Sequence, residues 1–424
     1  YEVRVRRAEE QHNGPKVFNR AVWENLRAYL EDEAKTYTGL TVLAVRARAT
    51  GNLSNNSSRR FNVVATRKLP VIDEEGNWTA PVATRSIAAA LADIVRAHYG
   101  ANRADELLDI DRLLQLHEVW AARGDEFNYR FDTTVTLWEA LKICARAGRA
   151  YPIMNNQVIS FVRTAPQTVP ATIFNRRNTR NFRVEYSLIN EEDYDSIVAE
   201  YIDPNIGWVW NQVLCQPPGS AAANPQRVQY KGITDRNQAF REGIYEAHAS
   251  RVQRKRCRFE TELEGYIPNR GDLIIVANED FQYEQGGDIV AVNGTSLFTS
   301  EPLQWGGSRA IRLRKPDGSA DGPYLVTPGA APNEAVLNNP LDWVPYTGGA
   351  AERTKFQFGT VGSTLVEWIV QEIVPRGGNV VEIVGVNEVD SVHYVDQADP
   401  PPDITPGPIA HLGDGPIVRT ILVE

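Results

Sequence analysis

The N-terminal part of the chain has the spacing of half-buried β-strands. Apolar and polar residues alternate around Val3–Arg7, Leu40–Ala49 and Phe61–Arg67, a period of two that is typical of strands with one face in a core. Val22–Ala34 instead has an amphipathic helical pattern. Residues 1–70 are therefore expected to form a β-rich domain that continues from a preceding part of a longer polypeptide.

From Thr84 the period of the apolar residues becomes helical. One predicted helix carries Ile87, Leu91 and Ile94 and takes Gly100 as its C-cap. A second helix is predicted over Asp109–Arg123 and is followed by Gly124. These helices open a small α+β domain that we place at residues 71–164.

The third helix of this domain begins at Thr136, where Thr-Leu-Trp-Glu is a capping-box pattern, and ends at Gly148. A hairpin with a turn at Asn155-Asn156 follows it. Four residues on the inward stripes of the helices are predicted to pack the core: Leu113, Leu114, Trp138 and Leu141.

Beyond Pro166 the pattern returns to strands, so the fold class predicted for the whole chain is α+β and mostly β. Residues 165–278 are expected to form a first barrel-like domain that carries a long helix, 235–254, and residues 279–398 a second. Strands of the first are predicted at Thr172–Phe174, Phe182–Ser187, Ser196–Tyr201 and Val228–Lys231. Residues 399–424 are a proline-rich linker and the start of a following domain.

Composition narrows the class of protein. A chain of 424 residues exceeds what one hydrophobic core usually supports, which favours several domains. No apolar stretch approaches the roughly 20 residues needed to cross a bilayer as a helix. The net charge of −9 argues against a dedicated nucleic-acid binder, which needs a basic surface. Three widely separated cysteines suggest neither a disulfide framework nor a zinc knuckle.

Motifs that would indicate a chemical reaction are lacking. The sequence has no Walker-type phosphate loop, no G-x-G-x-x-G, no H-E-x-x-H and no G-x-S-x-G. Its six histidines are scattered singly. We therefore predict no catalytic, cofactor-binding or metal-binding residues, no cofactor and no enzymatic activity. Paired carboxylates leave a cell-wall glycosidase open as an alternative.

An adhesin is a second alternative, because the chain contains Arg270-Gly271-Asp272, a tripeptide that some adhesion receptors recognise. The tripeptide follows Pro268 and precedes a β-branched run, so the sequence favours a turn between strands with a positive φ at the glycine. Trp208-Val209-Trp210 is the one local pair of tryptophans, and alternation predicts that both rings lie on one face of a strand.

The order of these features resembles a known family. The stretches "FNYRFDTTVTLWEAL" (127–141), "FNRRNTRNFRVEYS" (174–187), "VAEYIDPNIGW" (198–208), "DRNQAFREGIYEAHASR" (235–251) and "YIPNRGDLIIV" (266–276) occur in the same sequential order in the hub region of lambda-type tail-tip J proteins. These TipJ-like central tail hubs, also called host-specificity proteins, occur in phages with long non-contractile tails and in gene transfer agents. The resemblance covers nearly the whole chain.

The resemblance implies a structural virion protein at the tail tip, assembled in the bacterial host cytoplasm. It would close the tail tube and connect it to host-recognition parts for DNA delivery. Such hubs are homotrimers in which two barrel-like domains per chain form a pseudo-sixfold ring. The implied partners are distal tail and tail tube proteins, the tape measure protein and other tail-tip proteins, with passing DNA only as a transient contact. Binding of a host receptor would rest on parts outside this chain.

Overall fold

A computed structural model of the chain describes Val42 and residues 63–73, 76–188, 190, 193–277, 285–360 and 367–402. The helix predicted at Val22–Ala34, the strands predicted at Val3–Arg7 and Leu40–Ala49, and the segment 403–424 lie outside these residues, apart from Val42. Residues 63–67, predicted to end a strand, belong to no strand. The fold described below belongs to one of two compact units, residues 65–424.

The first part of this unit contains three helices and a hairpin. A short pair, β1 (Lys68–Leu69) and β2 (Val82–Ala83), precedes them. The main elements follow in chain order: α1 (Ile87–Arg96), the 3-10 turn η2 (Asp105–Leu107), α2 (Ile110–Arg123), α3 (Leu137–Arg146), β3 (Ala150–Asn155) and β4 (Val158–Arg163). They confirm the three helices and the hairpin predicted from the period of the apolar residues.

Local side chains explain where the helices begin and end. Asp109 accepts a hydrogen bond from the backbone N–H of Arg112 at the start of α2, and Gly124 ends that helix at φ 68°. The predicted cap Thr136 likewise accepts from the N–H of Glu139. The predicted C-cap Gly100 is wrong. Helix α1 ends at Arg96 because Ala97 turns extended, and Gly100 then packs against the last turn, where a Cβ would lie 2.2 Å from the carbonyl oxygen of Ile94.

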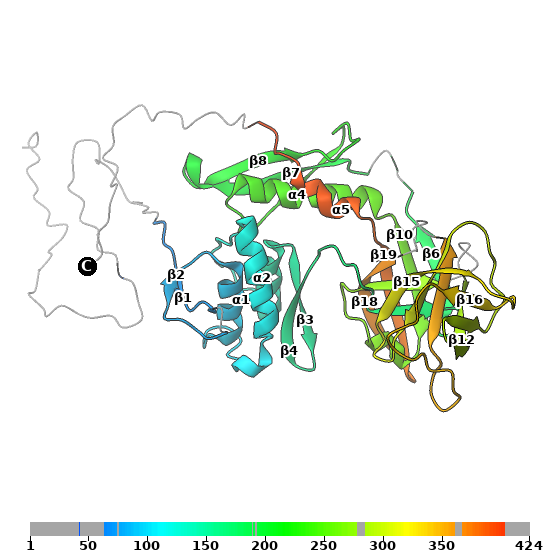
Figure 1. The fold of residues 1–424 in the computed structure, drawn as a ribbon. Helices are drawn as coiled ribbons and strands as arrows, with labels where there is room; N and C mark the ends of the chain where they lie inside the picture. The colour runs from blue at the N-terminus through cyan, green and yellow to red at the C-terminus, as the bar shows by residue number, and fades with distance from the viewer. Residues whose placement is uncertain are drawn as a thin grey trace, which may run out of the picture. The chain divides into compact units, whose positions relative to one another are not determined.

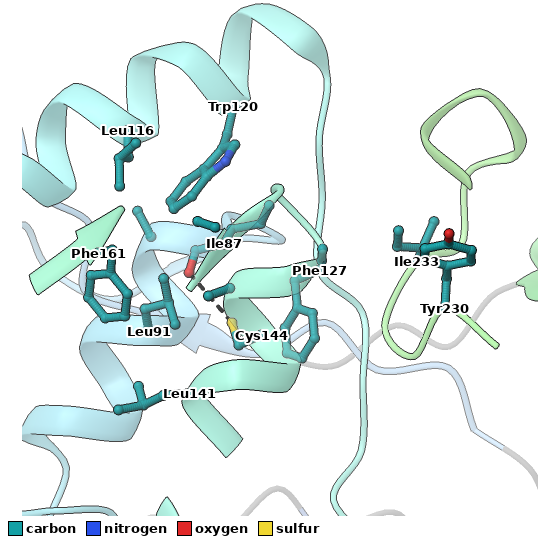
Figure 2. Packing of buried hydrophobic residues seen from close by; sticks show 14 of the residues in the cluster. Ile87, Leu91, Leu116, Trp120, Phe127, Leu141, Cys144, Phe161, Tyr230 and Ile233 are labelled. Atoms are coloured by element: carbon teal, nitrogen blue, oxygen red, sulfur yellow. Dashed lines mark hydrogen bonds between the residues drawn. The ribbon is translucent and has the colours of Figure 1, made fainter. Parts of the chain in front are cut away.

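The main hydrophobic core packs these helices against the hairpin and extends to buried residues between Ile197 and Ala247 (Figure 2). Leu113 and Leu141 are buried as predicted. Leu114 and Trp138 are only partly buried but both pack against the cluster, so these two lie at the edge of the predicted core. Trp120 occupies the centre instead, with 1% of its surface exposed, and its Nε1–H donates to the carbonyl oxygen of Gly148 at 2.8 Å. The buried indole has its one donor satisfied, as a buried polar group must.

A six-stranded open sheet forms the next β body. Its strands follow the spatial order β5, β11, β18, β19, β10, β6. Their bounds are Thr172–Asn175, Leu273–Ala277, Glu367–Gly377, Val380–Asn387, Lys255–Thr261 and Arg180–Tyr186. Phe174, Phe259, Trp368 and Ile383 fill the core on one face. The sheet therefore combines strands from before residue 278 with two strands from after residue 366.

A closed six-stranded barrel is inserted between β11 and β18 of that sheet. Around the barrel the strands run β12 (Gln285–Asn293), β13 (Ser296–Thr299), β16 (Glu334–Leu337), β15 (Ala320–Pro328), β14 (Arg309–Arg314) and β17 (Lys355–Thr360). Ile311, Leu313, Phe356 and Phe358 are buried inside it. With this barrel the predicted class, α+β and mostly β, is confirmed. The boundaries at 278 and 398 stay predictions, although strand pairing assigns β18 and β19 to the first β body.

A third sheet carries the long helix. It has the order β8 (Val209–Cys215), β7 (Ser196–Asp203), β9 (Pro225–Gln229), and α4 (Arg236–Val252) contacts β7 and β8 (Figure 1). Ala239, Ile244 and Ala247 of α4 are buried. The C-terminal helix α5 (Ser391–Tyr394) and the turn η5 (Val395–Gln397) also contact α4. Strand β8 begins within the predicted Trp208–Trp210 strand and extends beyond it, and β9 begins three residues earlier than predicted.

Candidate functional site

The Arg270-Gly271-Asp272 segment is a turn, and its three residues contact other residues of the same chain. Gly271 has φ 90°, and a Cβ there would lie 1.8 Å from the hydroxyl oxygen of Tyr151. The Arg270 guanidinium lies 4.6 Å from the centre of the Tyr151 ring. Asp272 accepts a hydrogen bond from the backbone N–H of Asn269 at 2.7 Å. The predicted turn and the positive φ at its glycine are confirmed, and the tripeptide joins the hairpin to the six-stranded sheet.

Three of the histidines that the structure describes have side-chain partners. His117 Nδ1 lies 3.1 Å from Ser86 Oγ, and His248 Nε2 lies 2.9 Å from Ser391 Oγ. His393 contacts the carboxylate of Glu388. Within the described ranges, no group of three or more His, Cys, Asp or Glu side chains is arranged to hold a metal ion. No helix in those ranges is long and apolar enough to span a membrane.

All three cysteines are buried free thiols. Burial raises the pKa of Cys215 and of Cys257 to about 12, and it raises the pKa of Cys144 well above its ordinary value. Since the thiolate is the nucleophile, such thiols are inert in the folded chain.

The densest group of charges joins α2, the start of the hairpin, α4 and the C-terminal segment. Its centre is Arg149, whose side chain is 6% exposed. The Arg149 Nη2 atom lies 2.9 Å from Oε1 of Glu242 and 2.8 Å from Oδ2 of Asp396. Its guanidinium also lies 4.0 Å from the ring centre of Tyr245. Burial alone would lower the pKa of Arg149, but Glu242 and Asp396 outweigh it and raise that pKa.

Two further arginines complete this group, which we call the charge cluster: Arg123, Arg149, Arg241, Asp125, Glu242 and Asp396. Arg123 contacts Asp125 at 2.7 Å and Asp396 at 3.1 Å, and Arg241 contacts Asp125 at 2.6 Å. The cluster thus balances three cations with three carboxylates. Breaking such a buried network by removing one partner typically costs about 3 to 5 kcal/mol, because an uncompensated charge is left behind.

Arg163, at the end of β4, lies next to the charge cluster. Burial, followed by repulsion from Arg123 and Arg149, lowers the pKa of Arg163 to about 10. Its Nε has no hydrogen-bond partner. With Arg163 included, the arginines in this region outnumber the carboxylates.

A polar seam joins the closed barrel to the six-stranded sheet. Arg177, after β5, contacts Asp288 and Glu301 of the barrel, each at 2.7 Å. Arg314 of β14 contacts Glu264 at 2.8 Å. Burial and then a hydrogen bond that Glu264 donates to Glu352 when protonated raise the pKa of Glu264, even though Arg314 opposes that rise. Among the described residues, Ile173, Ile275 and Ala320 form a small apolar patch at this seam.

A surface that mixes exposed apolar and polar side chains lies on the face of the third sheet that α4 does not cover. Trp210 of β8 is 50% exposed and Leu214 is 39% exposed, and they pair with Ile202 and Val198 of β7 on the same face. Trp208 has φ 63° and precedes β8, so the prediction that both tryptophans lie on one face of a strand is wrong. The left-handed residue interrupts the alternation on which that prediction rested.

The charge cluster could not be found in the sequence, because its members lie far apart along the chain: Arg149 and Glu242 are separated by 93 positions and Arg123 and Asp396 by 273. The one available signal was Arg149 itself, a long charged side chain at the start of an apolar strand. Sequence reasoning predicts no site residues, and the cluster is an assembly of contacts between distant segments of the chain.

No family model matches the chain. Among solved structures, it is similar to a chain from the virion of a native gene transfer agent (GTA) particle, with a TM-score of 0.37 and 9% identity over 66% of this chain and 47% of that one. It is similar to the tail protein from Neisseria meningitidis MC58, with a TM-score of 0.31 and 10% identity over 66% and 67%. The 43 kDa tail protein of prophage MuSo2 from Shewanella oneidensis gives a TM-score of 0.29 and 13% identity over 60% and 63%. The chain thus spans about half the length of the first of these.

Proposed function

We propose that this chain is a non-enzymatic structural protein of a virion, the central tail-tip hub of a long-tailed non-contractile phage or of a gene transfer agent. In this role it closes the tail tube and connects it to host-recognition parts. The sequence resemblance supports the proposal, since its quoted stretches run in hub order from residue 127 to residue 276.

The observation that carries the proposal is the presence of two barrel-like β bodies in one chain. One is the closed barrel of β12 to β17, and the other is the open six-stranded sheet into which it is inserted. Three copies would supply six such bodies around an axis. A ring of that kind matches a sixfold tail tube, and closed rings require matched interfaces between subunits.

The proposed partners follow from this position. A homotrimer would contact distal tail and tail tube proteins on one side and other tail-tip proteins on the other, with the tape measure protein and passing DNA inside. The exposed Trp210 face of the third sheet is a candidate for one of these contacts, because exposed tryptophan is enriched at protein interfaces. Contact with the host receptor is assigned to parts outside the chain.

A reconstruction of intact tails by cryo-electron microscopy tests the proposal. We expect density for three copies of this fold on the tail axis, with the two β bodies of each copy alternating around a central channel. Six equivalent copies, or copies at the periphery of the tail, would overturn the hub assignment. A turbidity assay on bacterial cell walls tests the absence of glycosidase activity, and clearing by the purified chain would contradict it.

A further inference from the structure

Residues 388–402 form one segment, here called the C-terminal strap, which leaves β19 and passes along α4 (Figure 1). His248 Nε2 lies 2.9 Å from Ser391 Oγ at one end, and Arg236 donates to the carbonyl oxygen of Pro401 at 2.5 Å at the other. Asp396 lies between these contacts, in the charge cluster. Residue numbers fall along α4 as they rise along the strap, so the two run antiparallel.

Polar contacts dominate the docking of the strap. Val392 and Val395 are its buried apolar side chains, and of these Val395 belongs to the main core cluster. Two valines remove only a small apolar area from water. The strap is therefore attached by a small apolar area and by the ionic contacts of Asp396, an arrangement that favours opening as a local unit before global unfolding.

Withdrawal of the strap would unbalance the charge cluster. Asp396 is one of three carboxylates that compensate three arginines, and it contacts both Arg123 and Arg149. Without it, two carboxylates face three guanidinium groups, with Arg163 nearby. Arg123 ends α2 and Arg149 precedes β3, so the unbalanced charge would fall on the junction of α2, the hairpin and α4.

We infer that the C-terminal strap undocks from α4 as one unit while the rest of the chain stays folded. Undocking removes Asp396 from the charge cluster, and this makes the junction between α2, the hairpin and α4 more mobile. A displacement of the chain at Pro402 is thereby communicated to helices far from it in the sequence. The inference rests on contacts within this chain and does not depend on the proposed function.

Hydrogen–deuterium exchange measured on the purified full chain tests the inference. Asp396→Asn keeps the shape of the side chain and removes its charge, and Asp399→Asn is the matched control because it removes one charge from an exposed position of the same strap. We expect Asp396→Asn to accelerate exchange about tenfold or more in residues 391–402, in 120–126 and in 149–152. The closed barrel of β12 to β17 should exchange as in the wild type, and Asp399→Asn should stay within about twofold of it everywhere.

A double variant separates charge balance from general loss of stability. Arg123→Gln removes one cation, so Arg123→Gln with Asp396→Asn restores equal numbers of charges and should exchange more slowly at 149–152 than Asp396→Asn alone. Acceleration confined to 391–402 would show that the strap opens without loosening the junction. Equal acceleration of the barrel strands, or no recovery in the double variant, would also overturn the inference.

Discussion

Replacing Gly271 by alanine tests whether the geometry of the turn explains the Arg-Gly-Asp tripeptide. Gly271 has φ 90°, and a Cβ there would lie 1.8 Å from the Tyr151 hydroxyl oxygen and 2.7 Å from Cγ1 of Val162. The substitution therefore adds both backbone strain and a steric clash. The backbone N–H of Gly271 also donates to the carbonyl oxygen of Val370 at 2.7 Å, which holds the turn against movement.

Backbone strain and the steric clash each have a typical cost in the free energy of unfolding. A left-handed backbone conformation costs a residue with a Cβ roughly 1 to 2 kcal/mol. Forcing an extra methyl group into a packed site costs about 1 to 3 kcal/mol more. Gly271→Ala should therefore reduce the free energy of unfolding by about 2 to 5 kcal/mol. Gly377→Ala is the matched control, since Gly377 has φ 84° in the same sheet but nothing within 4 Å of its Cβ position. Its free energy of unfolding should fall only by the cost of backbone strain.

Urea unfolding followed by tryptophan fluorescence and circular dichroism measures these differences. Tyr151→Phe removes the hydroxyl that lies nearest to the new Cβ, so combining it with Gly271→Ala should cost less than the sum of the two single substitutions. The reasoning is refuted if Gly271→Ala costs no more than Gly377→Ala. It is equally refuted if Tyr151→Phe recovers none of the loss.

Three further predictions concern the core, the charge cluster and the thiols. Trp120→Ala should lower stability by about 3 to 5 kcal/mol in thermal or urea unfolding, and Trp138→Ala by clearly less, because Trp138 is only partly buried; equal losses would contradict the assigned core. Burial opposes ionisation of Asp396, but Arg149 and Arg123 outweigh it and lower its pKa below 3.8, so its contribution is present above pH 3.8 and is lost as pH falls through the lowered value. Asp396→Asn should accordingly lose stability at pH 7 but flatten the acid limb of a stability-versus-pH curve, whereas an unchanged limb would show that Asp396 does not titrate there. Native protein should react with a thiol reagent such as DTNB only as fast as it opens, and rapid modification before urea is added would contradict the burial of all three thiols: Cys144, Cys215 and Cys257.

Features that depend only on residues close together along the chain can be predicted from the sequence. The cap at Thr136, the end of the second helix before Gly124 and the turn at Gly271 each follow from local chemistry, and all three are predicted from the sequence. The choice between Trp120 and Trp138 was not readable, because both fall on apolar stripes and only the packed helices decide which one lies inside. Pairings between distant segments were also inaccessible, since local patterns give a strand its face but not its neighbour.

The insertion of the closed barrel has a consequence for how such chains can evolve. Ile275 of β11 pairs directly with Glu367 of β18. The two strands on either side of the inserted barrel are therefore neighbours in the six-stranded sheet. A segment whose two ends lie on adjacent strands can be exchanged for another of different length or surface without altering the register around it. We therefore expect the sequences of related chains to diverge fastest within the barrel and to change least in β11 and β18. Recombination between lineages could then replace the barrel and leave the six-stranded sheet unchanged.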